Sequence, residues 1–155
     1  MIKLKKILYP TDFSESSLEA LKYAVSFARD YKARLVLMHV VNEQIFSEGL
    51  NLPRVTAPEA LEKEMASEAE RRLKAIIPAD ERSGLDWEMV ILHGMPFLEI
   101  VRYAKDKEID LIVIGTHGRS GLEHVIFGST AERVVRKAPC PVLSVQPAQR
   151  KFVIP

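Results

Sequence analysis

Glycines and hydroxyl residues gather in one segment of the chain, residues 115–130, directly after an uncharged apolar run. Glycines allow backbone amides to approach oxygen atoms closely, and Ser129 with Thr130 places hydroxyls and amides where a helix is predicted to begin. Arg119 can add a positive charge. Together these residues suit a chain of phosphate groups. The alternative is that the glycines only form a turn and that Ser129 only caps the helix.

A second candidate segment, Tyr9 to Asp12, follows the first predicted strand. An acidic residue at this point can bind a ribose hydroxyl, or a metal through phosphate, but it can equally cap the following helix. Both interpretations of Asp12 stay open. In an open doubly wound sheet the ligand crevice lies beyond the carboxyl ends of the strands, where the strand order reverses. If the strands before these two segments are neighbours, both segments meet there.

Other reactive side chains give weaker signals. His117 and His124 have no matching acid and nucleophile, so they do not form a catalytic set. His39 and His93 lie in or just after apolar runs and are interpreted as strand histidines. Cys140 is interpreted as a buried small residue. The chain has neither a P-loop sequence nor the dinucleotide glycine pattern after its first strand.

The elements that must position these residues alternate regularly along the chain. Apolar runs predict strands at residues 5–9, 34–41, 87–92, 110–114 and 141–145. Helical spacing predicts helices at residues 14–31, 58–77, 98–104 and 130–137, and loops remain at 42–57 and 116–127. The charges in residues 62–72 are interpreted as a solvated helix face. This order predicts an α/β fold, an open doubly wound parallel sheet with helices on both faces, Rossmann-like.

Length and composition set further limits. The 155 residues, 47% hydrophobic and 28% charged, fit one compact domain over residues 1–155. The formal net charge of +1 gives no bulk field for nucleic acid or an anionic membrane. One cysteine excludes an internal disulfide and fits a reducing compartment. Without a signal-peptide pattern or a membrane-length apolar run, a cytoplasmic protein is expected.

The glycine pattern also carries a family resemblance. Gly115-x2-Gly118-x9-Gly128-Ser129 after an apolar strand resembles the nucleotide-binding signature of the universal stress protein family. Residues 7–14 resemble that family's opening strand and loop, and residues 138–143 resemble its last strand. The similarity therefore covers nearly the whole chain.

This resemblance implies a five-stranded parallel sheet of order 3-2-1-4-5 and the ATP-binding branch of the family. By this resemblance, Asp12 would bind the adenine and ribose end of the ligand. Val41 corresponds to a position whose backbone groups contact the base, although a buried strand residue would look identical in the sequence. ATP is the implied ligand, with or without Mg²⁺ or Mn²⁺, and no protein metal site is implied. The implied nucleotide-binding residues are Pro10, Thr11, Asp12, Val41, Ile114, Gly115, Thr116, Gly118, Arg119, Gly128, Ser129 and Thr130.

The functional hypothesis is an ATP-binding regulatory or protective module of the stress response. ATP would order residues 116–127, with residues 42–57 as a second candidate, and so change a surface read by a partner. One alternative is a slow ATPase or nucleotidyl transferase, although no general base is evident; another is a pure interaction protein. A homodimer through the last strand is expected, because Val142, Leu143 and Val145 form an apolar edge.

Overall fold

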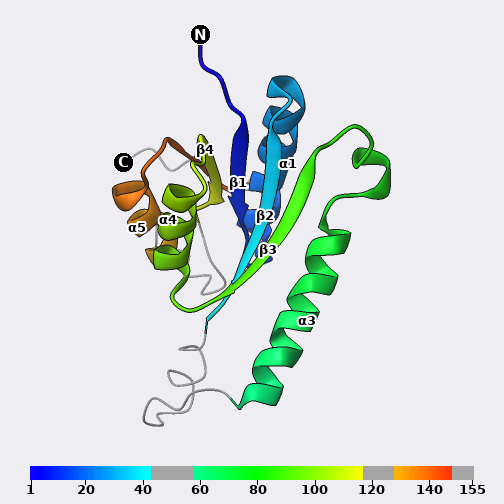
Figure 1. Ribbon diagram of the computed structural model, residues 1–155, viewed down its shortest axis with the longest axis vertical. Helices are drawn as coiled ribbons and strands as arrows, with labels where there is room; N and C mark the ends of the chain where they lie inside the picture. Colours follow the sequence, from blue (N-terminus) through cyan, green and yellow to red (C-terminus); the bar gives the residue numbers. More distant parts are fainter. Residues whose placement is uncertain (43–57, 117–127, 148–155) are drawn as a thin grey trace.

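The computed structural model describes residues 1–42, 58–116 and 128–147. Its centre is a five-stranded sheet of order β3-β2-β1-β4-β5 in which every neighbouring pair is parallel (Figure 1). The strands are β1 (Lys6–Pro10), β2 (Arg34–Val41), β3 (Trp87–His93), β4 (Leu111–Gly115) and β5 (Val142–Val145). The predicted fold class and strand order are confirmed, and the strand bounds differ from the predicted ones by one residue or less.

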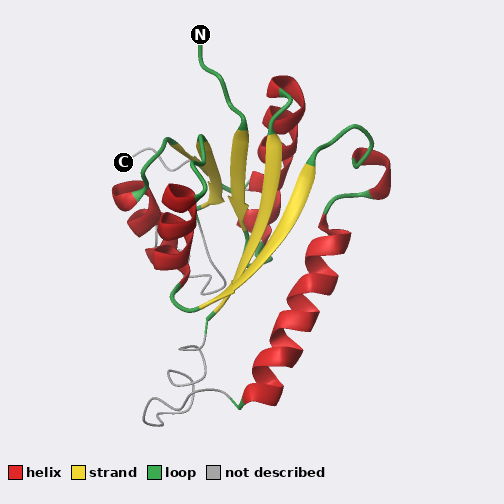
Figure 2. Cartoon of the chain, in the orientation of Figure 1, coloured by secondary structure: helices red, strands yellow, loops and turns green. Residues whose placement is uncertain are grey.

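Helices cover both faces of this sheet (Figure 2). They are α1 (Glu15–Tyr31), α3 (Glu59–Ile76), α4 (Pro96–Asp106) and α5 (Ser129–Lys137), with a short 3-10 turn at Ala79–Glu81. Helices α1 and α3 pack on one face, and α4 and α5 pack on the other. The order of helices along the chain thus produces the doubly wound arrangement that the alternation predicted.

The central strand β1 shows why the apolar runs are continuous. Ile7 and Tyr9 belong to the core beneath α1 and α3, whereas Leu8 belongs to the core beneath α4 and α5. All three side chains are fully buried. A strand covered on both faces has no solvent side on which polar residues could alternate, so its sequence lacks a period of two.

Helix α1 lies close to the sheet because small residues recur on its buried face. Ala20, Ala24 and Ala28 stand four residues apart and are 0–1% exposed. The helix begins at Ser14, whose side chain accepts a hydrogen bond from the Ser17 amide at 3.3 Å. It ends at Lys32 in the left-handed conformation, with a φ of 53°. Small residues at this spacing let the helix axis approach the strands, which brings its first turn toward the carboxyl ends of β1 and β4.

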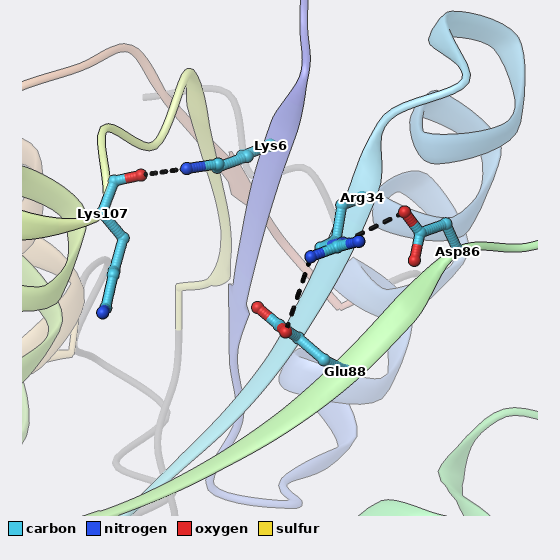
Figure 3. A network of polar contacts seen from close by, with 5 residues as sticks. All are labelled: Lys6, Arg34, Asp86, Glu88 and Lys107. Atoms are coloured by element: carbon cyan, nitrogen blue, oxygen red, sulfur yellow. Dashed lines mark hydrogen bonds and ion pairs between the residues drawn. The ribbon is translucent and has the colours of Figure 1, made fainter.

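A polar network lies at the opposite, amino-terminal edge of the sheet (Figure 3). Arg34 on β2 contacts Asp86 at 3.0 Å and Glu88 at 4.0 Å, which links the beginnings of β2 and β3. Lys6 Nζ donates to the backbone oxygen of Lys107 at 2.8 Å. A hollow of about 320 Å³ adjoins these residues. Because Arg34 and Lys6 are both engaged in protein contacts, we do not interpret this network as a ligand site.

In the described part of the chain, no helix is both long enough and apolar enough to cross a bilayer.

Candidate functional site

A cavity of about 390 Å³ opens at the carboxyl ends of β1, β2 and β4. Strands β1 and β4 are neighbours in the sheet, although β2, β3 and the helices around them separate β1 from β4 along the chain. The sheet therefore reverses its order between them, which is where the crevice of an open α/β sheet forms. Nine predicted site residues line this cavity: Pro10, Thr11, Asp12, Ile114, Gly115, Thr116, Gly128, Ser129 and Thr130.

Among the predicted site residues that the structure describes, Val41 does not line the cavity. Val41 is 1% exposed, and its carbonyl oxygen accepts a hydrogen bond from the Gly94 amide at 3.0 Å. The residues on either side of it, Val40 and Asn42, do line the cavity. Gly118 and Arg119 lie outside the described residues, as do His117 and His124. Their contribution stays a prediction.

The loop between β1 and α1 is fixed by a buried polar network. The Thr11 amide donates to the Met38 oxygen at 2.8 Å, and the Thr11 hydroxyl is hydrogen-bonded to the hydroxyl of Ser17. Tyr9 donates its hydroxyl proton to the Ser17 backbone oxygen at 2.7 Å. Burial raises the pKa of Tyr9, and hydrogen bonds from Ser17 and Thr11 partly oppose this effect. The network therefore keeps the first turn of α1 and the end of β1 in one fixed arrangement.

Asp12 lies in the cavity wall and also shapes the turn before α1. Its Oδ1 accepts a hydrogen bond from the Ser14 amide at 2.9 Å. Ser14, not Asp12, is the residue that caps the helix. The capping alternative for Asp12 is therefore wrong in detail, because the carboxylate bonds an amide that precedes the helix. Asp12 is the only carboxylate among the described lining residues.

Gly115 ends β4 where the first turn of α1 comes closest to the sheet. A Cβ atom at this position would lie 2.7 Å from both Ser16 C and Ser17 N, and 2.8 Å from Ser16 O. Contacts this short with backbone atoms do not occur between a real Cβ and its neighbours. Gly115 is therefore required for the packing of α1 against β4. The sequence did not indicate this role, because there the glycine was interpreted as part of a phosphate site or of a turn.

Hydrogen bonds bring the end of β4 and the start of α5 together. The Thr116 amide donates to the Val145 oxygen at 2.9 Å, and the Thr116 oxygen accepts from the Gly128 amide at 2.5 Å. Gly128 is the N-cap of α5 and makes no side-chain cap hydrogen bond, so Ser129 is the first helical residue and not the cap. The first-turn amides of a helix carry partial positive charge. The amino terminus of α5, in the cavity wall, therefore favours an anionic group.

The remaining wall is mostly apolar. Strands β2 and β4 contribute Met38, Val40 and Ile114, and helices contribute Met65, Pro96, Ile100 and Ala131. The sequence interpretation missed the helical residues because nothing local shows which turn of α3 or α4 reaches the crevice. It could have found Met38 and Val40, since they lie in the carboxyl-terminal half of β2. The cavity thus places an apolar surface beside a helix amino terminus, which suits an amphiphilic anion.

His39 also lines the cavity, although the sequence suggested only a strand histidine. Its Nδ1 lies 2.8 Å from the Thr11 carbonyl oxygen. A carbonyl oxygen can only accept, so Nδ1 carries the proton. Among the residues that the structure describes, no three His, Cys, Asp or Glu side chains are grouped to hold a metal ion.

Cys140 lies away from this cavity, partly buried against the core beneath α4 and α5. Burial, followed by the charge of Asp110, raises the pKa of its thiol, and a hydrogen bond from the Ile112 backbone opposes this effect. Its interpretation as a packed small residue agrees with this placement.

Comparison with known proteins gives a family and several relatives. The universal stress protein family model matches residues 3–146. Universal stress protein MJ0531 of Methanocaldococcus jannaschii is 38% identical, over 95% of this chain and 85% of that protein. The structure of MJ0577, a universal stress protein of the same organism, is similar with a TM-score of 0.81 at 33% identity, covering 98% of this chain and all of that one.

A universal stress protein solved in complex with cAMP is also similar, with a TM-score of 0.64 at 25% identity, covering 95% of this chain and 100% of that chain. The family model spans nearly the whole sequence, the relatives align along most of their length, and the sheet order is the one that the resemblance implied. This chain belongs to the universal stress protein family.

Proposed function

We propose that this protein binds an adenine nucleotide, ATP in particular, in the cavity at the carboxyl ends of β1 and β4, and that it acts as a nucleotide-responsive regulatory or protective module. The observation that carries this proposal is the pairing of an apolar wall with the amino terminus of α5 in one cavity. A planar base is apolar on its faces, whereas a phosphate chain is anionic, and the two walls match these two ends. The relative solved with cAMP supports an adenine nucleotide as the class of ligand.

Within this proposal, each end of the ligand has its own residues. The base lies against Met38, Val40 and Ile100, and Asp12 accepts a hydrogen bond from a ribose hydroxyl. The phosphates lie at the amides of residues 128–130, where Gly118 and Arg119 are expected to add further contacts. A Mg²⁺ or Mn²⁺ ion, if bound, would be held chiefly by phosphate oxygens, with Asp12 as the one carboxylate of the described lining.

The module would signal through the segment between β4 and α5. Thr116 and Gly128, at the two ends of residues 117–127, are joined by a hydrogen bond in the cavity wall. A ligand that contacts both ends would favour one arrangement of the segment between them. Unchanged hydrogen exchange of residues 117–127 on addition of ATP would contradict this mechanism.

The binding proposal is tested on freshly purified protein. The protein is denatured, any released nucleotide is identified by chromatography, and ATP is titrated calorimetrically into nucleotide-free wild type. Gly118→Val and Asp12→Asn are expected to weaken binding, whereas Asp86→Asn, a carboxylate at the other edge of the sheet, serves as the matched control. Absence of both bound nucleotide and binding heat would refute the proposal. Steady phosphate release would instead favour the slow ATPase, and nucleotide transfer would favour the transferase.

We also propose a homodimer that pairs through β5 in the cytoplasm. Within the described sheet β5 has β4 as its only strand neighbour, and Val142 and Leu143 are partly exposed on it. An apolar edge strand is open to pairing with a second copy. Light scattering that gives a monomer at micromolar concentration would contradict the dimer, and recovery of the protein outside the cytoplasmic fraction would contradict the location.

A further inference from the structure

Phe13 adopts a backbone conformation that is unusual for a large side chain. Its φ is 64°, in the left-handed region that glycine, Asn and Asp occupy far more readily. It stands between two hydrogen bonds that define the turn: the Phe13 amide donates to Thr11 Oγ1 at 2.9 Å, and the Ser14 amide donates to Asp12 Oδ1 at 2.9 Å. The conformation of Phe13 therefore determines how Thr11 and Asp12 are presented to the cavity.

Two side chains from other elements hold the Phe13 ring. The His39 ring on β2 lies 4.9 Å away between centroids, tilted by 32°. The Arg72 guanidinium carbon on α3 lies 4.1 Å from the ring centroid. A guanidinium at this distance is attracted to the negative face of the ring. Favourable contacts of this kind can offset the cost of an unfavourable backbone conformation.

We propose that Arg72 is a positioning residue for the nucleotide site and that it acts through Phe13. Arg72 is not among the residues that line the cavity, whereas Asp12, Thr11 and His39 are. By holding the Phe13 ring, Arg72 maintains the turn that directs the Asp12 carboxylate and fixes the Thr11 carbonyl against His39. The effect on ligand affinity rests on the proposed nucleotide site; the effect on the turn does not.

The same contact links ligand binding to the docking of helix α3. Met65, which lines the cavity, precedes Arg72 by two helical turns and so lies on the same face of α3. A nucleotide that packs against Met65 and the 11–13 turn favours the docked helix, and the docked helix in turn favours the nucleotide. Nucleotide binding must therefore stabilise the docked helix by the same free energy by which docking of the helix strengthens nucleotide binding.

The test compares two neighbouring arginines. Arg72→Gln removes the charge above the ring, whereas Arg71→Gln is the matched control, because Arg71 pairs with Glu68 at 2.6 Å on the exposed side of α3. In ligand-free protein, Arg72→Gln is expected to speed amide exchange of Phe13 and Ser14 relative to Arg71→Gln. Loss of a cation–π contact corresponds to roughly three- to tenfold weaker ATP binding and a similar factor in exchange. Arg72→Lys is expected to restore most of both.

A double-mutant cycle assigns the effect to the Phe13 ring. In the Phe13→Leu background, which keeps an apolar side chain but no ring, Arg72→Gln is expected to cause no further change in Phe13 or Ser14 exchange. Equal exchange of these amides in Arg72→Gln and Arg71→Gln would overturn the inference, whether or not nucleotide binds. Unchanged ATP affinity with faster exchange would overturn the link to the site. Failure of wild type to bind ATP would refute the proposed function, and the ligand-free exchange would still decide the role of Arg72.

Discussion

Substitution of Gly115 by alanine separates two explanations for a glycine at the end of β4. If Gly115 serves mainly to let backbone amides reach a phosphate, Gly115→Ala should change ligand binding and leave the free protein stable. The structure predicts instead that Gly115→Ala mainly destabilises the free protein. The added Cβ would lie 2.7–2.8 Å from three backbone atoms of Ser16 and Ser17, so α1 and β4 must move apart.

The size of the effect follows from what the Cβ meets. Introducing a methyl group into a well-packed site costs about 1–3 kcal/mol, and we expect the upper end because backbone atoms cannot rotate away as a side chain can. For a domain of this size, a loss of about 3 kcal/mol lowers the melting temperature by about 6–12 °C. Movement of the first α1 turn would also disturb the hydrogen bonds of Ser17 with Tyr9 and Thr11.

Gly84→Ala provides the control for conformation alone. Gly84 has a φ of 73° and no atom within 4 Å of an added Cβ, so alanine there meets backbone strain without a clash. Its expected cost is about 1 kcal/mol. Urea unfolding of nucleotide-free wild type and both variants measures the free energies. If Gly115→Ala unfolds at the same urea concentration as wild type, the packing argument is refuted and the glycine belongs to the ligand site alone.

Three further predictions test individual groups. Tyr9→Phe should cost about 1–2 kcal/mol near neutral pH through loss of the bond to Ser17. Because burial raises the pKa of Tyr9 above its usual 10.0 in the folded protein, the unfolded chain releases this proton first, so the wild-type advantage in urea unfolding should persist below pH 10.0 and shrink as the pH rises above it. Arg34→Gln should leave the unfolding midpoint unchanged in calorimetry, because its ion pair with Asp86 is exposed to water and salt, and a clear drop would show that the edge network stabilises the sheet. Cys140 should react with iodoacetamide more slowly than free cysteine at about pH 8, since its raised pKa leaves less thiolate; an equal rate would contradict the burial of this thiol.

The local order of elements was predictable because it depends on neighbouring residues. Continuous apolar runs predicted each strand to within a residue or so, and the apolar stripe of residues 61–76 predicted α3. Strict alternation of strands and helices left few topologies, and the family resemblance selected the sheet order that the structure has. Half of the described cavity lining was also predictable, because the residues after β1 and β4 are those that any switch point exposes.

The contacts between elements were decided by the tertiary structure. Spacing along the chain cannot show that the first turn of α1 leaves no room for a side chain at Gly115, or that Val40 and Asn42, rather than Val41, face the cavity. Nor can it show that Arg72 on α3 reaches the ring of Phe13. Periodicity and motif spacing are local properties, so the elements, the family and the segments of the site could be predicted before the fold was known. Which atoms meet inside the cavity depends on how distant segments pack, and only the folded chain establishes those distances.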